Sequence, residues 1–253
     1  MFELKGGVKM EDVSFTYPDT GIEALKNVSF DLKPGQKMAL IGRTGSGKST
    51  IAELLVRKYD VTEGQVSMDE ADLRDLNLSK LRAQIGYVPQ DVFLFSDTSR
   101  DNIALGREDA TMEEIKQAVH QAVILKEIEA LPEKFSTLVG ERGVTLSDVQ
   151  KQRISLARAL IKNPQLLIFD DCLSAVDANT EHVIINNLNE YLADKTAIII
   201  THRIFSLMDF DKIVVLDEGR IVEEGTHNSL MSARGYYFDL YEKQRLEDKK
   251  MAL

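Results

Sequence analysis

The sequence carries one glycine-rich octapeptide, Gly42-Arg43-Thr44-Gly45-Ser46-Gly47-Lys48-Ser49. It fits the pattern G-x-x-x-x-G-K-[ST], in which glycines let the backbone wrap closely around anionic oxygens. An apolar run at 38–41 precedes it, and residues 50–58 follow with a helical pattern. Strand, loop and helix in this order predict a phosphate-binding loop, because backbone N–H groups and the helix N-terminus both favour an anion. A glycine-rich turn that meets the pattern by chance is the alternative, and the flanking elements argue against it.

In loops of this kind the lysine holds the β- and γ-phosphates of a nucleotide, and the following hydroxyl ligates Mg²⁺. We therefore expect Lys48 to bind phosphate and Ser49 to bind the metal ion. The backbone and side chains of the whole octapeptide, together with Thr50, are the expected nucleotide-binding set.

A second phosphate-site element occurs at residues 166–171, which read Leu-Leu-Ile-Phe-Asp-Asp. An apolar strand that ends in carboxylates suits a Mg²⁺ site, because ligands bind beyond the carboxyl ends of parallel strands. We expect Asp170 to hold Mg²⁺ and Asp171 to polarise an attacking water. An ordinary pair of aspartates at a strand end is the alternative.

The bulk composition limits the class of protein. With 253 residues, the chain is long enough for one large domain or a domain with a subdomain. The longest apolar runs are only a few residues, far below the roughly 20 that cross a bilayer, and the N-terminus has no signal-peptide core. A net charge of −10 argues against nucleic acid as a partner. The single cysteine, Cys172, excludes an intrachain disulfide and fits a reducing cytosol.

Strand and helix patterns alternate along the chain, which predicts an α/β fold with a mostly parallel sheet and helices on both faces. We expect a RecA-like P-loop NTPase core, a small N-terminal antiparallel β-subdomain and an inserted α-helical subdomain. The whole chain, 1–253, is expected to form one domain, with its core at 1–90 and 163–253 and its helical subdomain at 91–162. The expected strands are 9–15, 26–32, 38–41, 64–68, 85–88, 165–169, 196–201 and 212–216. The expected helices are 50–58, 112–120, 123–131, 147–162 and 179–192, and the charged run 242–250 is expected to be a solvated helix end.

Further motifs follow in a fixed order: Tyr17 in Val-Ser-Phe-Thr-Tyr, Gln90 after an apolar strand, Leu-Ser-Asp-Val-Gln at 146–150, Ser-Ala-Val-Asp at 174–177, and His202 in Thr-His-Arg. With the two phosphate elements, they resemble the nucleotide-binding domain of an ATP-binding cassette (ABC) transporter over nearly the whole chain. The resemblance implies ATP and Mg²⁺ as ligands.

The resemblance also implies a role for each matching residue. Tyr17 would stack on adenine, although it could instead simply cover the small sheet. Gln90 would contact Mg²⁺ and the attacking water, and His202 the γ-phosphate, with Asp171 as the third catalytic residue. Ser147 and Gln150 belong to the signature motif, which in the family caps the ATP held by the opposite subunit.

The exporter branch of the family is indicated by residues 137–143, which resemble its X-loop, and by 92–98 and 100–103, which resemble the segment that meets the membrane domain. Phe93 and Phe95 are either exposed at that interface or buried in the helical subdomain. The implied partners are a second nucleotide-binding domain, in a head-to-tail homodimer or heterodimer, and a transmembrane domain that is fused or separate. The implied location is the cytoplasmic face of a membrane, and the isolated domain is expected to be soluble.

Two positions depart from the family pattern. Asp171 stands where the family has glutamate, and Asp148-Val149 replace the two glycines of the signature. A shorter carboxylate is displaced from its place by roughly 1 Å, which can cost about 10²-fold in rate. Asp148 would bring negative charge near the γ-phosphate, and Val149 adds a β-branched side chain where close backbone approach is expected.

In a homodimer both changes fall in each ATP site, whereas in a heterodimer they fall in different sites. The altered signature is either natural or engineered.

Three functional hypotheses follow. The first is the ATP-hydrolysing motor of an exporter. The second is a degenerate half that binds ATP, hydrolyses little and regulates an active partner. The third, a soluble ABC ATPase acting on chromosomes or ribosomes, is disfavoured by the acidic charge and by the absence of sustained heptads before the signature.

Overall fold

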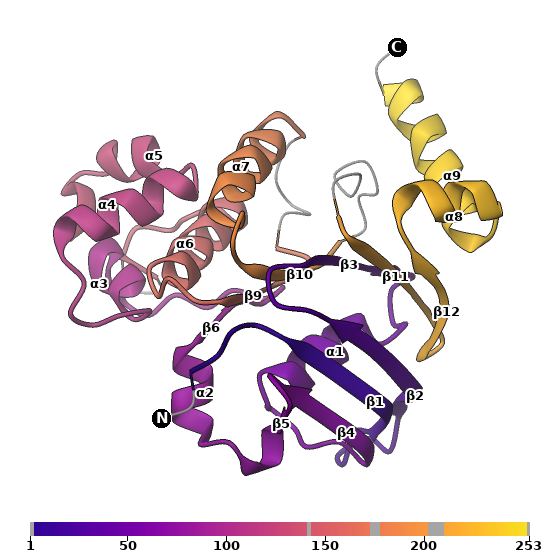
Figure 1. The fold of residues 1–253 in the computed structure, drawn as a ribbon. Helices are drawn as coiled ribbons and strands as arrows, with labels where there is room; N and C mark the ends of the chain where they lie inside the picture. The colour runs from indigo at the N-terminus through magenta and orange to yellow at the C-terminus, as the bar shows by residue number, and fades with distance from the viewer. Residues whose placement is uncertain (1–2, 141–142, 173–177, 202–209, 252–253) are drawn as a thin grey trace.

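The structure is a computed structural model that describes residues 3–140, 143–172, 178–201 and 210–251 (Figure 1). A six-stranded sheet in the order β12-β11-β3-β10-β9-β6 forms its centre. Every neighbouring pair in this sheet is parallel except β11 and β12. The bounds are β3 Lys37–Gly42, β6 Ile85–Val88, β9 Leu166–Asp170, β10 Thr196–Ile200, β11 Lys212–Asp217 and β12 Arg220–Gly225. The predicted α/β fold with a mostly parallel sheet is confirmed.

The central strands are nearly continuous apolar runs because both faces of the sheet are covered. Along β3, Met38 and Leu40 pack with helix α1 (Lys48–Leu55) and an antiparallel sheet. Ala39 and Ile41 pack on the other side with helices α8 (His227–Ala233) and α9 (Tyr236–Met251). This follows from the two-residue repeat of a strand. One strand therefore joins two separate cores, and its last residue, Gly42, begins the phosphate loop.

A second sheet, β2-β1-β4-β5, is antiparallel and packs with α1 against one face of the central sheet (Figure 1). The predicted N-terminal antiparallel subdomain is thus present. Its strands are β1 Val8–Thr16, β2 Glu23–Leu32, β4 Glu63–Met68 and β5 Ala71–Asp72. The turn at 17–22 joins β1 to β2 and brings Tyr17 to the edge of this sheet.

Helix α1, Lys48–Leu55, is shorter at its C-terminus than the predicted 50–58. Arg57 adopts a left-handed conformation (φ 50°), and the N–H groups of Arg57 and Lys58 bond back to Leu54 and Glu53. These bonds form a Schellman motif, which ends a helix and satisfies its last carbonyls.

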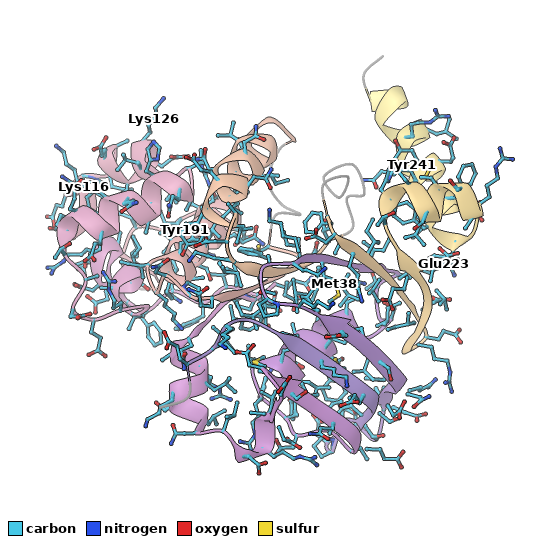
Figure 2. All side chains as sticks on the ribbon, in the orientation of Figure 1. Met38, Lys116, Lys126, Tyr191, Glu223 and Tyr241 are labelled. Atoms are coloured by element: carbon cyan, nitrogen blue, oxygen red, sulfur yellow. The ribbon has the colours of Figure 1, made fainter. Side chains whose placement is uncertain are left out.

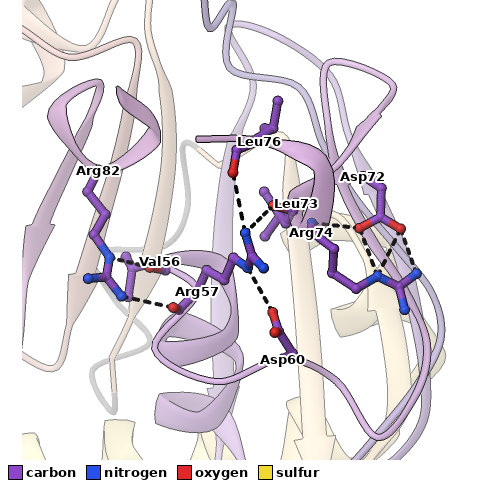
Figure 3. Close-up of polar contacts among 8 residues, drawn as sticks. All are labelled: Val56, Arg57, Asp60, Asp72, Leu73, Arg74, Leu76 and Arg82. Atoms are coloured by element: carbon purple, nitrogen blue, oxygen red, sulfur yellow. Dashed lines mark hydrogen bonds and ion pairs between the residues drawn. The ribbon is translucent and has the colours of Figure 1, made fainter. Parts of the chain in front are cut away.

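Two arginines tie this end of α1 to its surroundings (Figure 3). Arg82 donates to the carbonyls of Val56 and Arg57 at 3.0 and 2.8 Å. Arg57 in turn donates to the carbonyl of Leu73 at 3.0 Å and pairs with Asp60. The phosphate-loop helix is therefore fixed at its carbonyl end, because orphan carbonyls have found partners.

Residues 91–162 hold half of the remaining helices of the described residues, together with two short strands. A short antiparallel ladder, β7 Asp97–Thr98 with β8 Leu138–Val139, lies within the segment. The predicted helical insert is confirmed, and this ladder is an addition that was not predicted, because two-residue strands leave no periodic pattern in the sequence. The helices are α3 Ser99–Ala104, α4 Met112–Gln121, α5 Leu125–Glu129 and α6 Asp148–Leu160. With α7, Ala178–Tyr191, they cover the other face of the sheet (Figure 1).

Several elements were not predicted. Besides β7 and β8, they are the short helices η1 Leu73–Asp75, α2 Leu78–Ala83, α3, η2 Lys134–Ser136 and α8 His227–Ala233, and the strands β5 and β12. Helix α9, Tyr236–Met251, contains the predicted charged helix end but begins earlier. Figure 2 shows Glu223 and Tyr241 close to α8 and α9, at the β12 end of the sheet. Among the described residues, the helices are too short or too polar to cross a membrane.

Candidate nucleotide site

The phosphate loop and the two-carboxylate strand meet at one edge of the central sheet. Strands β3 and β9 run parallel, with β10 between them, so their carboxyl ends point the same way. Gly42 ends β3, and Asp170 ends β9. This edge is where open α/β sheets place their ligands.

Two glycines of the loop have no room for a side chain. A Cβ on Gly42 would lie 2.1 Å from the carbonyl oxygen of Leu216, and one on Gly47 would lie 2.6 Å from that of Ala24. Gly47 also has φ 103° at the N-cap of α1. The loop is thus packed between β2 and the β11–β12 turn, and the Gly219 N–H donates to the Ser46 carbonyl at 3.1 Å.

Lys48 is buried at the start of α1, and its ammonium faces the loop. Nζ donates to the carbonyls of Gly42 and Arg43 at 2.9 and 2.7 Å. Burial lowers the pKa of Lys48, and the nearby Asp171 and Asp170 carboxylates act in the opposite direction. Among the residues that the structure describes, this ammonium bonds loop oxygens alone, so it is available to an anion arriving at the loop.

The Ser49 hydroxyl donates to Asp170 Oδ1 at 2.9 Å. Burial raises the pKa of the Asp170 carboxyl, the Ser49 bond lowers it, and the neighbouring Asp171 charge raises it again. A hydroxyl and a carboxylate are hard oxygen donors of the kind that Mg²⁺ takes. These two residues fit the ion, because a buried carboxylate beside a second one is stabilised by an added cation.

Asp171 follows β9 directly and is buried, with 8% of its surface exposed. Its backbone is left-handed (φ 47°), and its N–H donates to the Ile200 carbonyl at 3.0 Å. Aspartate is among the residues best tolerated in this conformation. Asp171 thus lies beside Asp170 and Lys48.

Tyr17 reaches the site from the antiparallel sheet. Its hydroxyl is 2.9 Å from Thr50 Oγ1 and donates to Glu53 Oε2 at 2.9 Å. Its ring meets Phe15 and Tyr59 edge to face, at centroid distances of 4.9 and 5.5 Å. Tyr17 therefore covers the small sheet and also faces the phosphate-loop helix, whereas its stacking on adenine stays a prediction.

A cleft of about 400 Å³ opens between Tyr17 and the phosphate loop. Its lining residues are Tyr17, Ile22, Glu23, Ala24, Lys26, Gly45, Gly47, Lys48, Ser49, Thr50, Glu218 and Gly219. Sequence reasoning missed the contribution of β2 and of the β11–β12 turn, since both come from parts of the chain without a local motif. It also missed Glu53, which bonds Tyr17.

Other predicted residues are not brought to this cleft. Gln90 is exposed two residues after β6 and makes no hydrogen bond to Ser49 or Asp170. Ser147 and Gln150 form a capping box at the start of α6, with bonds of 3.0 and 3.3 Å between side chain and backbone. This local role follows from the S-x-x-Q pattern. His202 and residues 174–177 lie outside the described residues.

Comparison with known proteins agrees with this geometry. Residues 25–174 match the family described as ABC transporter. The chain is 46% identical over 241 residues to the probable multidrug resistance ABC transporter ATP-binding/permease protein YheI of Bacillus subtilis strain 168, covering 95% of this chain and 41% of that protein. It is 45% identical over 245 residues to the multidrug resistance-like ATP-binding protein MdlA of Escherichia coli K12, covering 97% of this chain and 42% of that protein.

A solved structure of a bacterial Atm1-family ABC exporter with ATP bound superposes with a TM-score of 0.91 at 41% identity, covering 95% of this chain and 42% of that one. The chain thus spans less than half the length of the curated relatives that it matches. The fold, the phosphate loop and these similarities agree over nearly all of the chain. It therefore belongs to the ABC transporter family, as a nucleotide-binding domain of the exporter type.

Proposed function

We propose that this domain is an ATP-hydrolysing motor that binds Mg-ATP in the cleft between Tyr17 and the phosphate loop. One observation carries the proposal: the Ser49 hydroxyl bonds Asp170 beside the buried Lys48 ammonium, at the ligand-binding edge of the sheet. A metal-binding pair next to a phosphate-binding cation is the arrangement that phosphoryl transfer requires. ABC-type ATPase activity is the activity of the family to which the chain belongs.

The roles of the site residues follow from their places. Lys48 and the backbone N–H groups of residues 42–50 hold the phosphates, and the Tyr17 ring lies against the base. Ser49 and Asp170 hold Mg²⁺, with Gln90 joining when its loop approaches. Bound Mg²⁺ supplies neutralisation of charge on the phosphate oxygens. Asp171 orients the attacking water and takes its proton, with Gln90 and His202 beside it.

Partners of the domain are inferred from its surface. Ser147 and Gln150 stand at the exposed N-terminus of α6, where a second nucleotide-binding domain would present its ATP to them. We infer that residues 1–253 act as one domain, with 91–162 as the subdomain that carries this signature. Closing two such domains around ATP would drive a membrane domain between two states.

The membrane domain is expected to be part of the full-length chain, since the named relative YheI combines ATP-binding and permease parts. Phe93 and Phe95 are 61% and 52% exposed and pack edge to face at 5.1 Å. They are therefore surface residues. This favours the alternative in which they lie at the interface with the membrane domain over burial in the helical subdomain. A groove of about 280 Å³ beside them is lined by Val92, Phe93, Leu94, Gly140, Thr145, Leu146 and Lys151. We infer that this face receives the membrane domain, on the cytoplasmic side.

A second candidate function is a degenerate half that binds ATP and hydrolyses little. It is favoured by Asp171 and by the altered signature. Asp148 is the first residue of α6, and its side chain is 87% exposed and paired with Lys151 at 3.0 Å. An exposed carboxylate at this helix start would face the γ-phosphate of the opposite subunit, where like charge is unfavourable.

Replacing Asp148 with glycine or asparagine is expected to raise ATP turnover roughly tenfold, because either change removes the like charge facing the phosphate. Phosphate release at high protein concentration measures the effect. Glu113→Gln, an exposed acid in the same lobe, is the control and should leave turnover unchanged. If glycine raises turnover and asparagine does not, then the close approach of the signature backbone to ATP, and not the charge of Asp148, limits closure of the ATP site.

Replacing Tyr17 with alanine is expected to weaken ATP binding by about ten- to a hundredfold, because base stacking is worth about 1–3 kcal/mol. Tyr17→Phe keeps the ring and loses the bonds to Thr50 and Glu53, so its affinity should stay within a fewfold of the parent. Calorimetric titration with ATP measures both. Equal losses in the two variants would mean that the hydroxyl, and not the ring, holds the nucleotide.

Steady-state Mg-ATP turnover against protein concentration tests the proposed function, with Lys48→Ala as the control for contaminating enzymes. A specific activity that climbs with concentration is expected for two domains that assemble around ATP. Turnover equal to the control, with ATP still binding, would favour the degenerate half.

A further inference from the structure

The exposed Arg43 of the phosphate loop contacts a residue nearly two hundred positions later in the chain. Its guanidinium carbon lies 5.5 Å from the centroid of the Tyr236 ring, the distance of a cation–π contact. The backbone carbonyl of the same arginine accepts the 2.7 Å bond from Lys48 Nζ. Arg43 therefore connects the first residue of α9 to the oxygen that holds the phosphate-binding lysine.

Tyr236 is itself held in place. Its N–H donates to Glu223 Oε1 at 2.6 Å, and the next N–H, of Tyr237, donates to Oε2 at 2.8 Å. Both bonds cap the start of α9 with a carboxylate, which suits the positive end of a helix. Glu223 lies on β12, beside α8 and α9 (Figure 2).

The same helix end is anchored in the core. Tyr237 is fully buried, packs in one cluster with Ile41 of β3, and bonds His227 Nδ1 at 2.7 Å. Since β3 leads directly into the phosphate loop, α9 and the loop share a rigid support. The backbone of Tyr236 is consequently held in place by Glu223 and by the buried Tyr237, so that its ring stays next to Arg43.

The ring of Tyr236, and not its hydroxyl, makes the contact. The hydroxyl oxygen is buried and has no hydrogen-bond partner in the part of the chain that the structure describes. An aromatic face is all that a cation–π contact uses. Phenylalanine at this position should therefore serve as well as tyrosine.

We propose that Tyr236 is a positioning residue for ATP binding: its ring holds Arg43, and through Arg43 it holds the loop carbonyls and Lys48 in the geometry that receives the phosphates. The inference rests on the proposed function, since it takes the loop to be where ATP binds. ATP affinity then depends on how α9 packs against the core, although α9 lies far from the phosphate loop in sequence.

The test first compares ATP affinity, by calorimetric titration, in three single variants. Tyr236→Leu is expected to raise the Kd for ATP about two- to fivefold, the range of an exposed cation–π contact, with kcat nearly unchanged. Tyr236→Phe should match the parent. Phe238 lies on the same helix and makes a similar contact, at 5.9 Å, with Arg234 at the end of α8; Phe238→Leu removes it and should also match the parent.

Arg43→Gln completes a double-mutant cycle. If Tyr236 acts through Arg43, then Tyr236→Leu should have no further effect in the Arg43→Gln background. An undiminished effect there, a parental Kd for Tyr236→Leu, or an equal loss in Phe238→Leu would each overturn the proposal. Titration of Lys48→Ala with ATP separates this outcome from failure of the proposed function. If Lys48→Ala binds ATP as well as the parent does, then the proposed function and this proposal are both overturned.

A fluorescence measurement covers the case in which Tyr236→Leu does not fold. The chain has no tryptophan, so Tyr236→Trp keeps an aromatic face and introduces a single reporter. ATP is expected to change its emission, because the indole would lie against the guanidinium of a phosphate-loop residue. Phe238→Trp is the matched control and should not respond. Equal responses, or none from Tyr236→Trp, would overturn the proposal.

Discussion

Replacing Asp171 with glutamate is expected to raise the rate of ATP hydrolysis by about 10²-fold. The carboxylate of Asp171 is fixed by a buried backbone whose N–H bonds the Ile200 carbonyl, so it cannot move forward to make up for its short side chain. One added methylene moves the carboxylate by roughly 1 Å, the scale on which misplacement of a catalytic group is felt. Single-turnover phosphate release with Mg-ATP measures the change.

Asp171→Asn is the matched control, since it keeps size and backbone and removes the base, and its rate should fall below that of the parent. The left-handed backbone at Asp171 tolerates glutamate less well, so thermal unfolding should show a small loss of stability in Asp171→Glu. An unchanged rate in a folded Asp171→Glu protein would show that side-chain length is not the limit, and would direct attention to Asp148 and Val149.

Replacing Lys48 with alanine is expected to weaken ATP binding and turnover by about 10²- to 10³-fold, the cost of removing one preorganised donor to a charged oxygen. The Lys48 ammonium is buried, lies beside Asp170 and Asp171, and bonds two loop carbonyls. Its loss leaves those carboxylates without their neighbouring cation, so that phosphate meets net negative charge. Calorimetric titration with ATP and Mg²⁺ measures the affinity.

Lys58→Ala is the matched control for this change. Lys58 follows the same helix, is exposed and pairs with Glu53, so its removal should leave ATP affinity within a fewfold of the parent. Equal losses in the two variants would mean that overall charge, and not the ammonium in the loop, governs binding.

The sequence alone was sufficient to predict the elements with strong local patterns. The octapeptide 42–49, the apolar strands around it and the aspartates at 170 and 171 form the expected edge of the sheet, because glycine pattern and strand burial are local properties. The helix end at Arg57 was not predictable, since a non-glycine residue in left-handed conformation leaves no clear signal.

Contacts between distant segments could not be predicted, because they depend on the whole fold and not on a local pattern. The Tyr17 hydroxyl meets Glu53, and the Arg43 guanidinium meets Tyr236, only after several strands have been placed side by side. No periodicity encodes such pairs. Gln90 was placed at the metal by resemblance, whereas the structure shows it exposed after β6.

The capped end of α1 has a mechanical consequence. Arg82 fastens the last carbonyls of that helix to α2, and β6 begins at Ile85, only three residues later. Helix α1 and strand β6 are therefore linked through Arg82 of α2. The strand that leads to Pro89 and Gln90 is therefore tied to the same helix that carries the phosphate loop at its other end.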